Sequence, residues 1–446
     1  MSGSRKYKII WAGPWNIKSA IADFSLQIAE ELKSKGHEVL VFRTETDEAM
    51  DIKPIDNKNF EVHFWKKEKI LKTRHDIIIN NFGNYYRFHG AVLDDLNEFN
   101  MLGILHDSFY CNLIAEWADK KHKAGIISAE EFLKNILKNT YGSNAYEKFN
   151  QGGDFRFWRD LEIMAQEYPL VEFLAYNLSG AVCHSEHYLQ RVKAACPGPV
   201  EKIPLCMKFD DLPENTMKNA DGNILTVAVI GHGNPNKRLE QILHAVGSDS
   251  LLKEKFRFKL IGQIEDDYKE KLENIAGKLN LHKAEFTGWV SDADLRKNLA
   301  EADVLCCLRE PILEGGSASL IFAMQSGRPV LVLNHGSYAE LPDDCVFKCS
   351  LDNETADIKK YLKWIYENLE SAYATGNKAK EFSINRNSAK FYADKLIPLI
   401  DEVILSEPVI SAAKSIGRTL SGFGLDAGDP ALERIGKTMD ELFNIY

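Results

Sequence analysis

The sequence predicts an α/β fold made of two Rossmann-like, doubly wound domains that face each other across a cleft. Short apolar runs alternate with amphipathic segments, a pattern typical of parallel sheets covered by helices. The pattern stops near residue 204 and starts again after residue 220. In addition, a chain of 446 residues is too long for one ordinary hydrophobic core.

The first domain is expected to span residues 1–210. Apolar residues recur at helical spacing from Ser19 to Lys35, which predicts a helix that Gly36 ends. Residues 116–168 are polar, aromatic and mostly helical in pattern, and we expect an insertion beside the cleft. Short apolar runs predict strands at residues 7–11, 38–42, 76–80, 101–105 and 180–184.

The second domain is expected to span residues 211–384, after a linker near residues 204–223 that carries turn-forming residues. Helices are predicted at residues 239–246 and 266–279. Ligands of doubly wound sheets bind at the carboxyl ends of the strands, so the site is expected between the domains. Strands are predicted at residues 225–231, 256–261, 303–308 and 329–334.

The composition excludes several classes of protein. Apolar residues make up 45% and charged residues 27%, which is ordinary for a soluble globular enzyme. The net charge of −10 argues against general nucleic-acid binding, which needs basic patches. The N-terminus shows no secretory signal, and no apolar run is long enough to span a bilayer. The eight cysteines lack zinc-ligand spacing, and Cys306 and Cys307 are interpreted as reduced core residues, so a cytoplasmic location is expected.

Two adjacent cations, Lys237 and Arg238, lie in the loop that follows the strand predicted at residues 225–231. A helix is expected to begin directly after them, so an anion could meet the cations and the helix N-terminus together. They could neutralise a diphosphate leaving group as its charge develops. A turn with a solvated basic pair is an equally good interpretation.

A second candidate loop covers residues 310–319 and leads from a strand into a helix. Gly315 and Gly316 allow the backbone to approach a ligand, and the helix N-terminus offers N–H groups to phosphate oxygens. Ser317 could cap this helix or bind phosphate. Glu314 could accept hydrogen bonds from sugar hydroxyls, or it could be a solvated loop carboxylate. The loop is neither a Rossmann dinucleotide fingerprint nor a Walker loop, so neither nicotinamide nor ATP use is indicated.

The order of these motifs resembles glycosyltransferase family 4, whose members are retaining enzymes of the GT-B architecture. The resemblance covers nearly the whole chain, and residues 339–344 resemble a bacterial branch often found among surface-polysaccharide enzymes. In GT-B enzymes the last helices often cross back to the first domain, and residues 385–446 are expected to do so. The matching segments are residues 19–25, 105–107, 182–185, 231–237, 288–290, 314–324 and 326–330.

The resemblance implies that the second domain binds a nucleotide-sugar donor. Lys237 matches the family's donor-phosphate lysine, but His232 stands where the family usually has an arginine, so Arg238 or a protonated His232 would complete the phosphate site. Glu314 matches the glutamate that contacts the transferred sugar, whereas Phe322 replaces the glutamate that usually binds the ribose. The other positions implied to bind the donor are Gly13, Trp289, Val290, Gly315, Gly316, Ser317, Ala318 and Ser319.

The resemblance also implies that the first domain binds the acceptor. His106 matches a histidine thought to contact the sugar or the reacting centre, and a general base and a structural role are equally open for it. Asp23 and Asp107 are acceptor-site candidates that could instead cap or pair locally. Residues 85–89 could line the acceptor site, although loop packing is slightly favoured. No aspartate pair suited to a divalent metal is visible, so no metal and no cofactor are expected beyond the nucleotide-sugar co-substrate.

The expected function is therefore retaining transfer of a hexose onto a hydroxyl of a glycan or lipid-linked acceptor, in bacterial polysaccharide or glycoconjugate assembly. The alternatives are a GT-B epimerase or phosphorylase and a non-catalytic nucleotide-sugar-binding scaffold. The end of the tail is amphipathic, so peripheral association with the inner face of the membrane, or an oligomer contact, is an alternative role for it. This pattern is carried by Leu432, Ile435, Met439 and Leu442.

Overall fold

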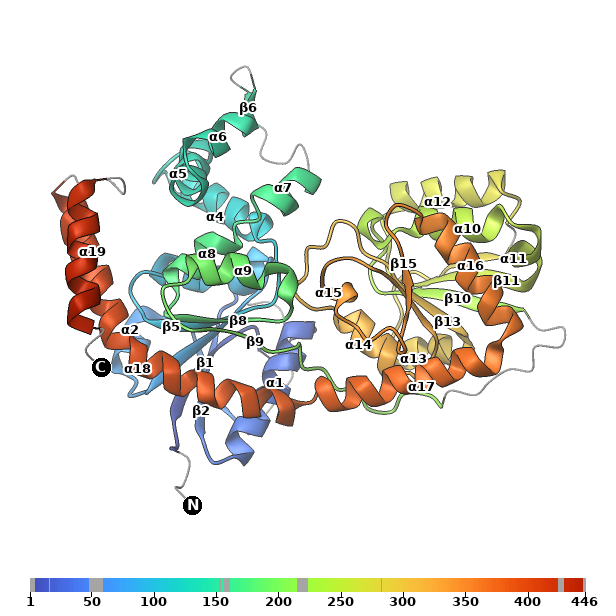
Figure 1. Ribbon diagram of the computed structural model, residues 1–446, viewed down its shortest axis with the longest axis horizontal. Helices are drawn as coiled ribbons and strands as arrows, with labels where there is room; N and C mark the ends of the chain where they lie inside the picture. Colours follow the sequence, from blue (N-terminus) through green and yellow to red (C-terminus); the bar gives the residue numbers. More distant parts are fainter. Residues whose placement is uncertain are drawn as a thin grey trace.

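The computed structural model contains two α/β units, which a linker and a long C-terminal helix connect (Figure 1). The structure describes residues 5–15, 17–47, 59–151, 154–155, 161–214, 224–281, 283–423 and 429–443.

The first unit is built on a seven-stranded parallel sheet with the order β3-β2-β1-β4-β5-β8-β9. Its interior strands are buried along almost their whole length, because helices or loops cover both faces of a parallel sheet. The strands are β1 (Lys8–Gly13), β2 (Glu38–Arg43), β3 (Glu61–Phe64), β4 (Ile77–Phe82), β5 (Met101–Leu105), β8 (Gly180–Cys183) and β9 (Val200–Lys202).

Helices follow most strands of this sheet, and five of them, α4 to α8, lie between β5 and β8 in the sequence. The predicted insertion, residues 116–168, covers most of α4 and all of α5 to α7. In Figure 1, α5 and α6 project away from the sheet. A short antiparallel pair, β6 (Asn150–Gln151) and β7 (Asp154–Phe155), follows α6. The helices are α1 (Ala20–Ser34), α2 (Lys67–Lys72), α3 (Tyr86–His89), the 3-10 helix η2 (Gly90–Asp95), α4 (Cys111–Lys123), α5 (Ala129–Tyr141), α6 (Ser143–Phe149), α7 (Leu161–Glu167), α8 (Val171–Asn177) and α9 (Glu186–Ala195).

The second unit is built on a six-stranded parallel sheet with the order β12-β11-β10-β13-β14-β15. Its strands are β10 (Leu225–Ile230), β11 (Phe256–Ile261), β12 (Ala284–Phe286), β13 (Val304–Cys307), β14 (Val330–Leu333) and β15 (Phe347–Cys349). Its helices are the 3-10 helix η3 (Pro235–Lys237), α10 (Leu239–Gly247), α11 (Ser250–Lys255), α12 (Asp266–Lys278), α13 (Asp292–Glu301), α14 (Ala318–Gln325), α15 (Gly336–Ala339), α16 (Glu354–Glu367) and α17 (Leu369–Arg386).

Each sheet has a point at which its strand order reverses. In the first sheet, β1 lies between β2 and β4, and in the second sheet β10 lies between β11 and β13. Loops on the two sides of such a point diverge, which leaves a crevice where open α/β sheets bind their ligands. The loops after β1, β4, β10 and β13 are therefore where the fold itself places binding sites.

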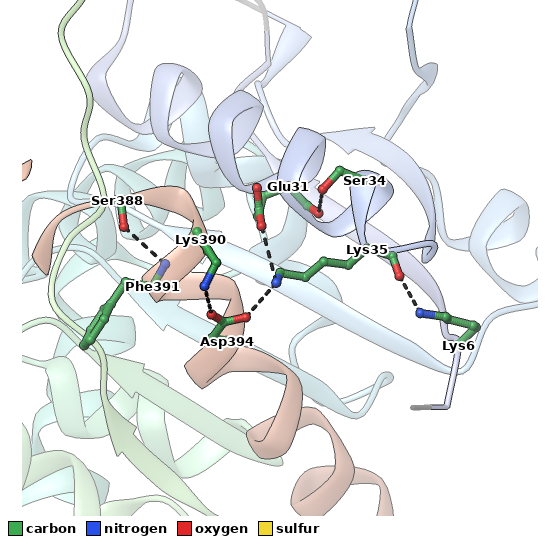
Figure 2. A network of polar contacts seen from close by, with 8 residues as sticks. All are labelled: Lys6, Glu31, Ser34, Lys35, Ser388, Lys390, Phe391 and Asp394. Carbon is green, nitrogen blue, oxygen red and sulfur yellow. Dashed lines mark hydrogen bonds and ion pairs between the residues drawn. The ribbon is translucent and has the colours of Figure 1, made fainter. Parts of the chain in front are cut away.

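The long helix α18 (Ala389–Gly422) returns from the second unit to the first, and α19 (Pro430–Phe443) follows it (Figure 1). Tyr392 is fully buried on α18, and its ring lies edge-on to Phe24 of α1 at 5.0 Å. At the rim of this contact, Lys35 lies 2.6 Å from Asp394 and 3.4 Å from Glu31 (Figure 2). Exposed ion pairs add little stability, so apolar packing anchors the returning helix.

In the two parallel sheets, the sequence pattern missed the short strands β3, β9, β12 and β15, and all four of them lie at a sheet edge. They contain charged residues and have no long apolar run, so their sequence resembles that of a loop. In the described part of the chain, every helix is too short or too polar to cross a bilayer.

Candidate active site

Lys237 lies on η3, close to the carboxyl end of β10, and is almost completely buried. Its Nζ donates a 2.6 Å hydrogen bond to the carbonyl oxygen of Ile230. Burial, and then the positive charge of Arg309, lower the pKa of Lys237 to about 7. A buried ammonium is costly until an anion joins it, so this position favours an anionic ligand.

Arg309 is the second buried cation of the site, and the sequence reasoning missed it. It lies two residues beyond the last residue of β13. Its guanidinium donates 2.8 Å and 3.0 Å hydrogen bonds to the carbonyl oxygen of Leu308 and to Ser319 Oγ. The only signal in the sequence was its position after a strand, because nothing in the family pattern assigns it a role.

Glu314 is held by two neighbours that contact the same carboxylate oxygen. The hydroxyl of Tyr338 donates a 2.8 Å hydrogen bond to Oε1, and Nε of Arg309 lies 3.4 Å from that atom. Complete burial raises the pKa of Tyr338 well above its usual value, so its hydroxyl remains a donor. Within the described residues Oε2 has no protein partner, and the side chain is 29% exposed, which leaves this oxygen free to accept a ligand hydroxyl.

The N-terminus of α14 adjoins these side chains. Ser317 caps the helix, because its Oγ accepts the N–H of Leu320 at 3.4 Å. Ser317 Oγ also lies 3.1 Å from Ser319 Oγ. In the described part of the chain, the backbone N–H groups of Ala318 and Ser319 donate to no protein acceptor. They are therefore available to an anion in the field of the helix dipole.

The two glycines before α14 are required by contact between the domains. A Cβ on Gly315 would lie 2.3 Å from the hydroxyl of Tyr188. A Cβ on Gly316 would lie 3.0 Å from Leu205 Cβ and 3.2 Å from His184 Cβ. The loop therefore packs tightly against the first domain.

Arg238 and His232 are held away from this cluster. Arg238 adopts a left-handed conformation with φ 57°, and its guanidinium donates 2.9 Å and 2.6 Å hydrogen bonds to Oε2 of the buried Glu354. The imidazole of His232 is about half exposed and lies 3.9 Å from Glu265.

Trp289 and Val290 follow the edge strand β12. The indole of Trp289 is 67% exposed, and Nζ of Lys18, from the loop after β1, lies 5.0 Å from the ring centroid. Val290 packs partly buried against the core. Gly13 ends β1, where a Cβ would lie 3.0 Å from Asn81 Cβ. The loop after β1 thus reaches across to the second domain.

Phe322 is buried on α14 and lies edge-on to Phe209 of the linker at 4.9 Å. The position at which the family usually has a ribose-binding glutamate is therefore occupied by apolar packing.

His106 is buried at the end of β5, and both of its ring nitrogens contact the first domain. Nε2 lies 3.1 Å from Asn81 Oδ1, and Nδ1 lies 3.1 Å from Nε2 of His184. Burial and the neighbouring His184 keep the pKa of His106 well below its usual value, so the ring is neutral at pH 7. No local pattern indicates that His184 is the partner of His106, because it lies 78 residues further along the chain.

Asp107 lines an open cavity of about 450 Å³ at the point where the first sheet reverses its strand order. Its Oδ2 accepts the N–H of Asn84 at 2.7 Å, and burial raises its pKa to about 7. Asp23 lies on α1 and is not among the lining residues; burial, and then Asp292, raise its pKa. The cavity is lined by Lys18, Ser19, Ile21, Gly83, Asn84, Tyr85, Phe88, His89 and Asp107.

The backbone connects this cavity directly to the loop that carries Glu314. Asp107 and Glu314 pair as an isolated antiparallel bridge. The N–H of Ser108 donates a 3.0 Å hydrogen bond to the carbonyl oxygen of Leu313. The N–H of Gly315 donates a 2.8 Å hydrogen bond to the backbone carbonyl oxygen of His106. The carboxyl ends of the two sheets therefore meet at the loop 313–315.

The described residues contain no group of three His, Cys, Asp or Glu side chains that could hold a metal ion. Metal independence remains a prediction, which chelation would test.

Comparison with known proteins adds a family match to this geometry. The second domain matches glycosyl transferases group 1. The match covers residues 212–382, and it includes Lys237, Arg309, Glu314 and the N-terminus of α14. The sequence matches no curated protein.

Similar solved structures extend the comparison to both domains. A glycosyltransferase from Rickettsia africae is 13% identical, covers 90% of this chain and 99% of its own, and has a TM-score of 0.60. Anabaena HepE in complex with UDP and glucose is 13% identical, with coverages of 89% and 99% and a TM-score of 0.58. Sucrose-phosphate synthase from Thermosynechococcus elongatus is 14% identical, with coverages of 90% and 100% and a TM-score of 0.58. These likenesses confirm the predicted GT-B architecture.

Proposed function

We propose that this chain is a retaining, metal-independent glycosyltransferase that moves a hexose from a nucleotide-diphosphate donor to a hydroxyl of a glycan or lipid-linked acceptor. The observation that carries the proposal is the meeting of two crevices. A cationic site with Lys237 and Glu314 lies where the second sheet reverses its order, and an open cavity with Asp107 lies where the first sheet does. The family match of the second domain supports the donor half of this assignment.

The donor would lie with its diphosphate near Lys237 and the N-terminus of α14, and with its sugar near Glu314. As the bond between the anomeric carbon and the phosphate oxygen breaks, negative charge develops on the diphosphate. Preorganised cations and N–H groups stabilise such charge most effectively in a site that excludes water. The carboxylate of Glu314, fixed by Tyr338, would accept hydrogen bonds from the sugar hydroxyls.

The acceptor would lie in the cavity beside Asp107. Tyr85, which is 46% exposed, packs edge-on against Phe88 at 5.0 Å, and such aromatic surfaces suit the apolar face of a sugar ring. Asp107 would receive a hydrogen bond from a sugar hydroxyl. The bridge between Asp107 and Glu314 supports this placement, because it brings the acceptor cavity to the donor sugar.

In the proposed reaction, the acceptor oxygen forms a bond to the anomeric carbon on the face that the diphosphate leaves. The hydroxyl proton passes to the departing phosphate oxygen, so that the sugar keeps its configuration. His106 would have a structural role rather than take this proton, since both of its ring nitrogens already have protein partners. We place the reaction in bacterial glycoconjugate assembly at the inner face of the membrane, and the eight buried free cysteines agree with a reducing compartment.

The test is transfer from radiolabelled sugar donors to a panel of glycans, beginning with UDP-glucose because Anabaena HepE was crystallised with it. Glu314→Ala should lower transfer by about 100-fold or more in a protein that circular dichroism shows to be folded. Asp119→Ala, an exposed carboxylate paired with Lys123, is the matched control and should transfer normally. Undiminished transfer by the Glu314 variant would show that this residue is not part of the active site. If the wild type binds the donor but transfers no sugar, the result would favour a non-catalytic nucleotide-sugar-binding scaffold.

A further inference from the structure

A diphosphate leaving group carries at least two negative charges, and Lys237 alone supplies one positive charge at most. The loop after β10 contains two more basic side chains, but neither reaches the lysine. His232 is half exposed beside Glu265, and Arg238 is bound through two nitrogens to Glu354. Moving Arg238 to a ligand would leave the carboxylate of Glu354 buried without its partner, which is strongly unfavourable.

We propose that Arg309 supplies the second cation, so that the diphosphate is bound between Lys237 on the β10 side and Arg309 on the β13 side of the crevice. The inference rests on the proposed function, because it assigns a role at the donor site. It moves the second phosphate-binding charge from the loop after β10, where the family pattern places it, to Arg309, the second residue after β13.

Three observations support Arg309. Its guanidinium is buried and bonds to Ser319 Oγ at 3.0 Å, which fixes it at the N-terminus of α14. The free N–H groups of Ala318 and Ser319 lie in the same helix turn. The backbone also joins the two loops directly, because the N–H of Glu310, next to Arg309, donates a 2.9 Å hydrogen bond to the carbonyl oxygen of Asn236, next to Lys237.

The charges around this pair do not balance. The carboxylate that faces both cations is Glu314, which lies 3.4 Å from Nε of Arg309. Tyr338 and Cys307 also face the cluster, but burial raises the pKa of both groups above neutral pH, so they stay uncharged. When Lys237 is protonated, two buried cations and a helix N-terminus thus face one partly exposed carboxylate, and a bound diphosphate would supply the missing negative charge.

Arg309 would also couple the leaving group to the sugar. Its Nε approaches Oε1 of Glu314, the same oxygen that Tyr338 holds. An arginine has a planar fork of five donors and can contact a phosphate and a carboxylate together, whereas a lysine cannot do so with fixed geometry.

The experiment compares the binding of UDP, pyrophosphate and uridine to the wild type and to single variants by isothermal titration calorimetry. Arg309→Gln should weaken UDP and pyrophosphate binding by about tenfold or more, because charge-assisted contacts are lost, and should leave uridine binding unchanged. Arg309→Lys keeps the charge, so its affinity for UDP should lie between those of the wild type and of Arg309→Gln. This variant also keeps the test valid if Arg309→Gln does not fold. His232→Gln and the double variant Arg238→Gln with Glu354→Gln, which leaves no unpaired buried carboxylate, are the controls from the loop after β10, and both should bind UDP like the wild type.

Undiminished UDP affinity in both Arg309 variants would overturn the inference while leaving the proposed function intact. A tenfold loss of UDP affinity that is confined to His232→Gln or to the variant of Arg238 would also overturn the inference. The second cation would then belong to the loop after β10. If the wild type binds neither UDP nor pyrophosphate, and GDP, dTDP and ADP also fail to bind, the donor function and the inference fall together. Circular dichroism and the melting temperature without ligand show whether each variant is folded.

Discussion

Diphosphate binding should be accompanied by proton uptake at Lys237, because the buried amine has a pKa of about 7 without a ligand. At pH 8 about one tenth of these amines are then protonated in the free protein. A bound diphosphate favours the charged ammonium and raises the pKa of the amine. Each UDP that binds should therefore take up about 0.9 proton at pH 8, when UDP itself is fully ionised.

Isothermal titration calorimetry in two buffers of different ionisation enthalpy measures this uptake directly. Lys237→Arg should bind UDP with almost no uptake, because a guanidinium stays charged throughout this pH range. Asp107→Asn is the control, since the pKa of Asp107 is also raised to about 7 and its removal should leave most of the uptake. UDP binding at pH 8 without proton uptake, or equal uptake by Lys237→Arg, would refute the assignment of Lys237 to the diphosphate.

Two further predictions concern the framework of the site. Arg238→Gln should lower the free energy of unfolding by about 3 kcal/mol, because it leaves the buried Glu354 without its partner, and urea denaturation measures this. Adding Glu354→Gln should restore part of that loss, and a double variant no more stable than Arg238→Gln would contradict the pairing. Gly315→Ala should reduce transfer and lower the melting temperature, because its Cβ would lie 2.3 Å from the Tyr188 hydroxyl. Gly277→Ala, on α12 with no neighbour within 4 Å of the added Cβ, is the control and should be neutral or slightly stabilising.

The interior of both sheets could be predicted from the sequence because buried parallel strands are written as short, nearly continuous apolar runs. Strands β1, β4, β5, β10 and β13 have this pattern, and they carry the loops that form the site. The edge strands could not be predicted in the same way. β9 has the sequence Val-Glu-Lys, for example, and its strand conformation depends on pairing with β8.

The individual roles in the site were less predictable than its location. Lys237 and Glu314 belong to loops that the pattern identified, whereas the ion pair that holds Arg238 joins residues 116 positions apart. No local pattern shows that an arginine is bound to a distant carboxylate. Arg309 was missed for the related reason that its burial and its contact with Ser319 arise only when α14 folds back on β13.

Binding of a nucleotide diphosphate sugar by the second domain can be measured with a thermal-shift panel. UDP, GDP, dTDP, ADP and their common sugar conjugates are each titrated against the wild-type chain. A ligand that binds only the native state raises stability with its concentration, so one nucleotide series should raise the melting temperature in this way. If none of the nucleotides raises it at any concentration, the donor site proposed at Lys237, Arg309 and Glu314 is contradicted.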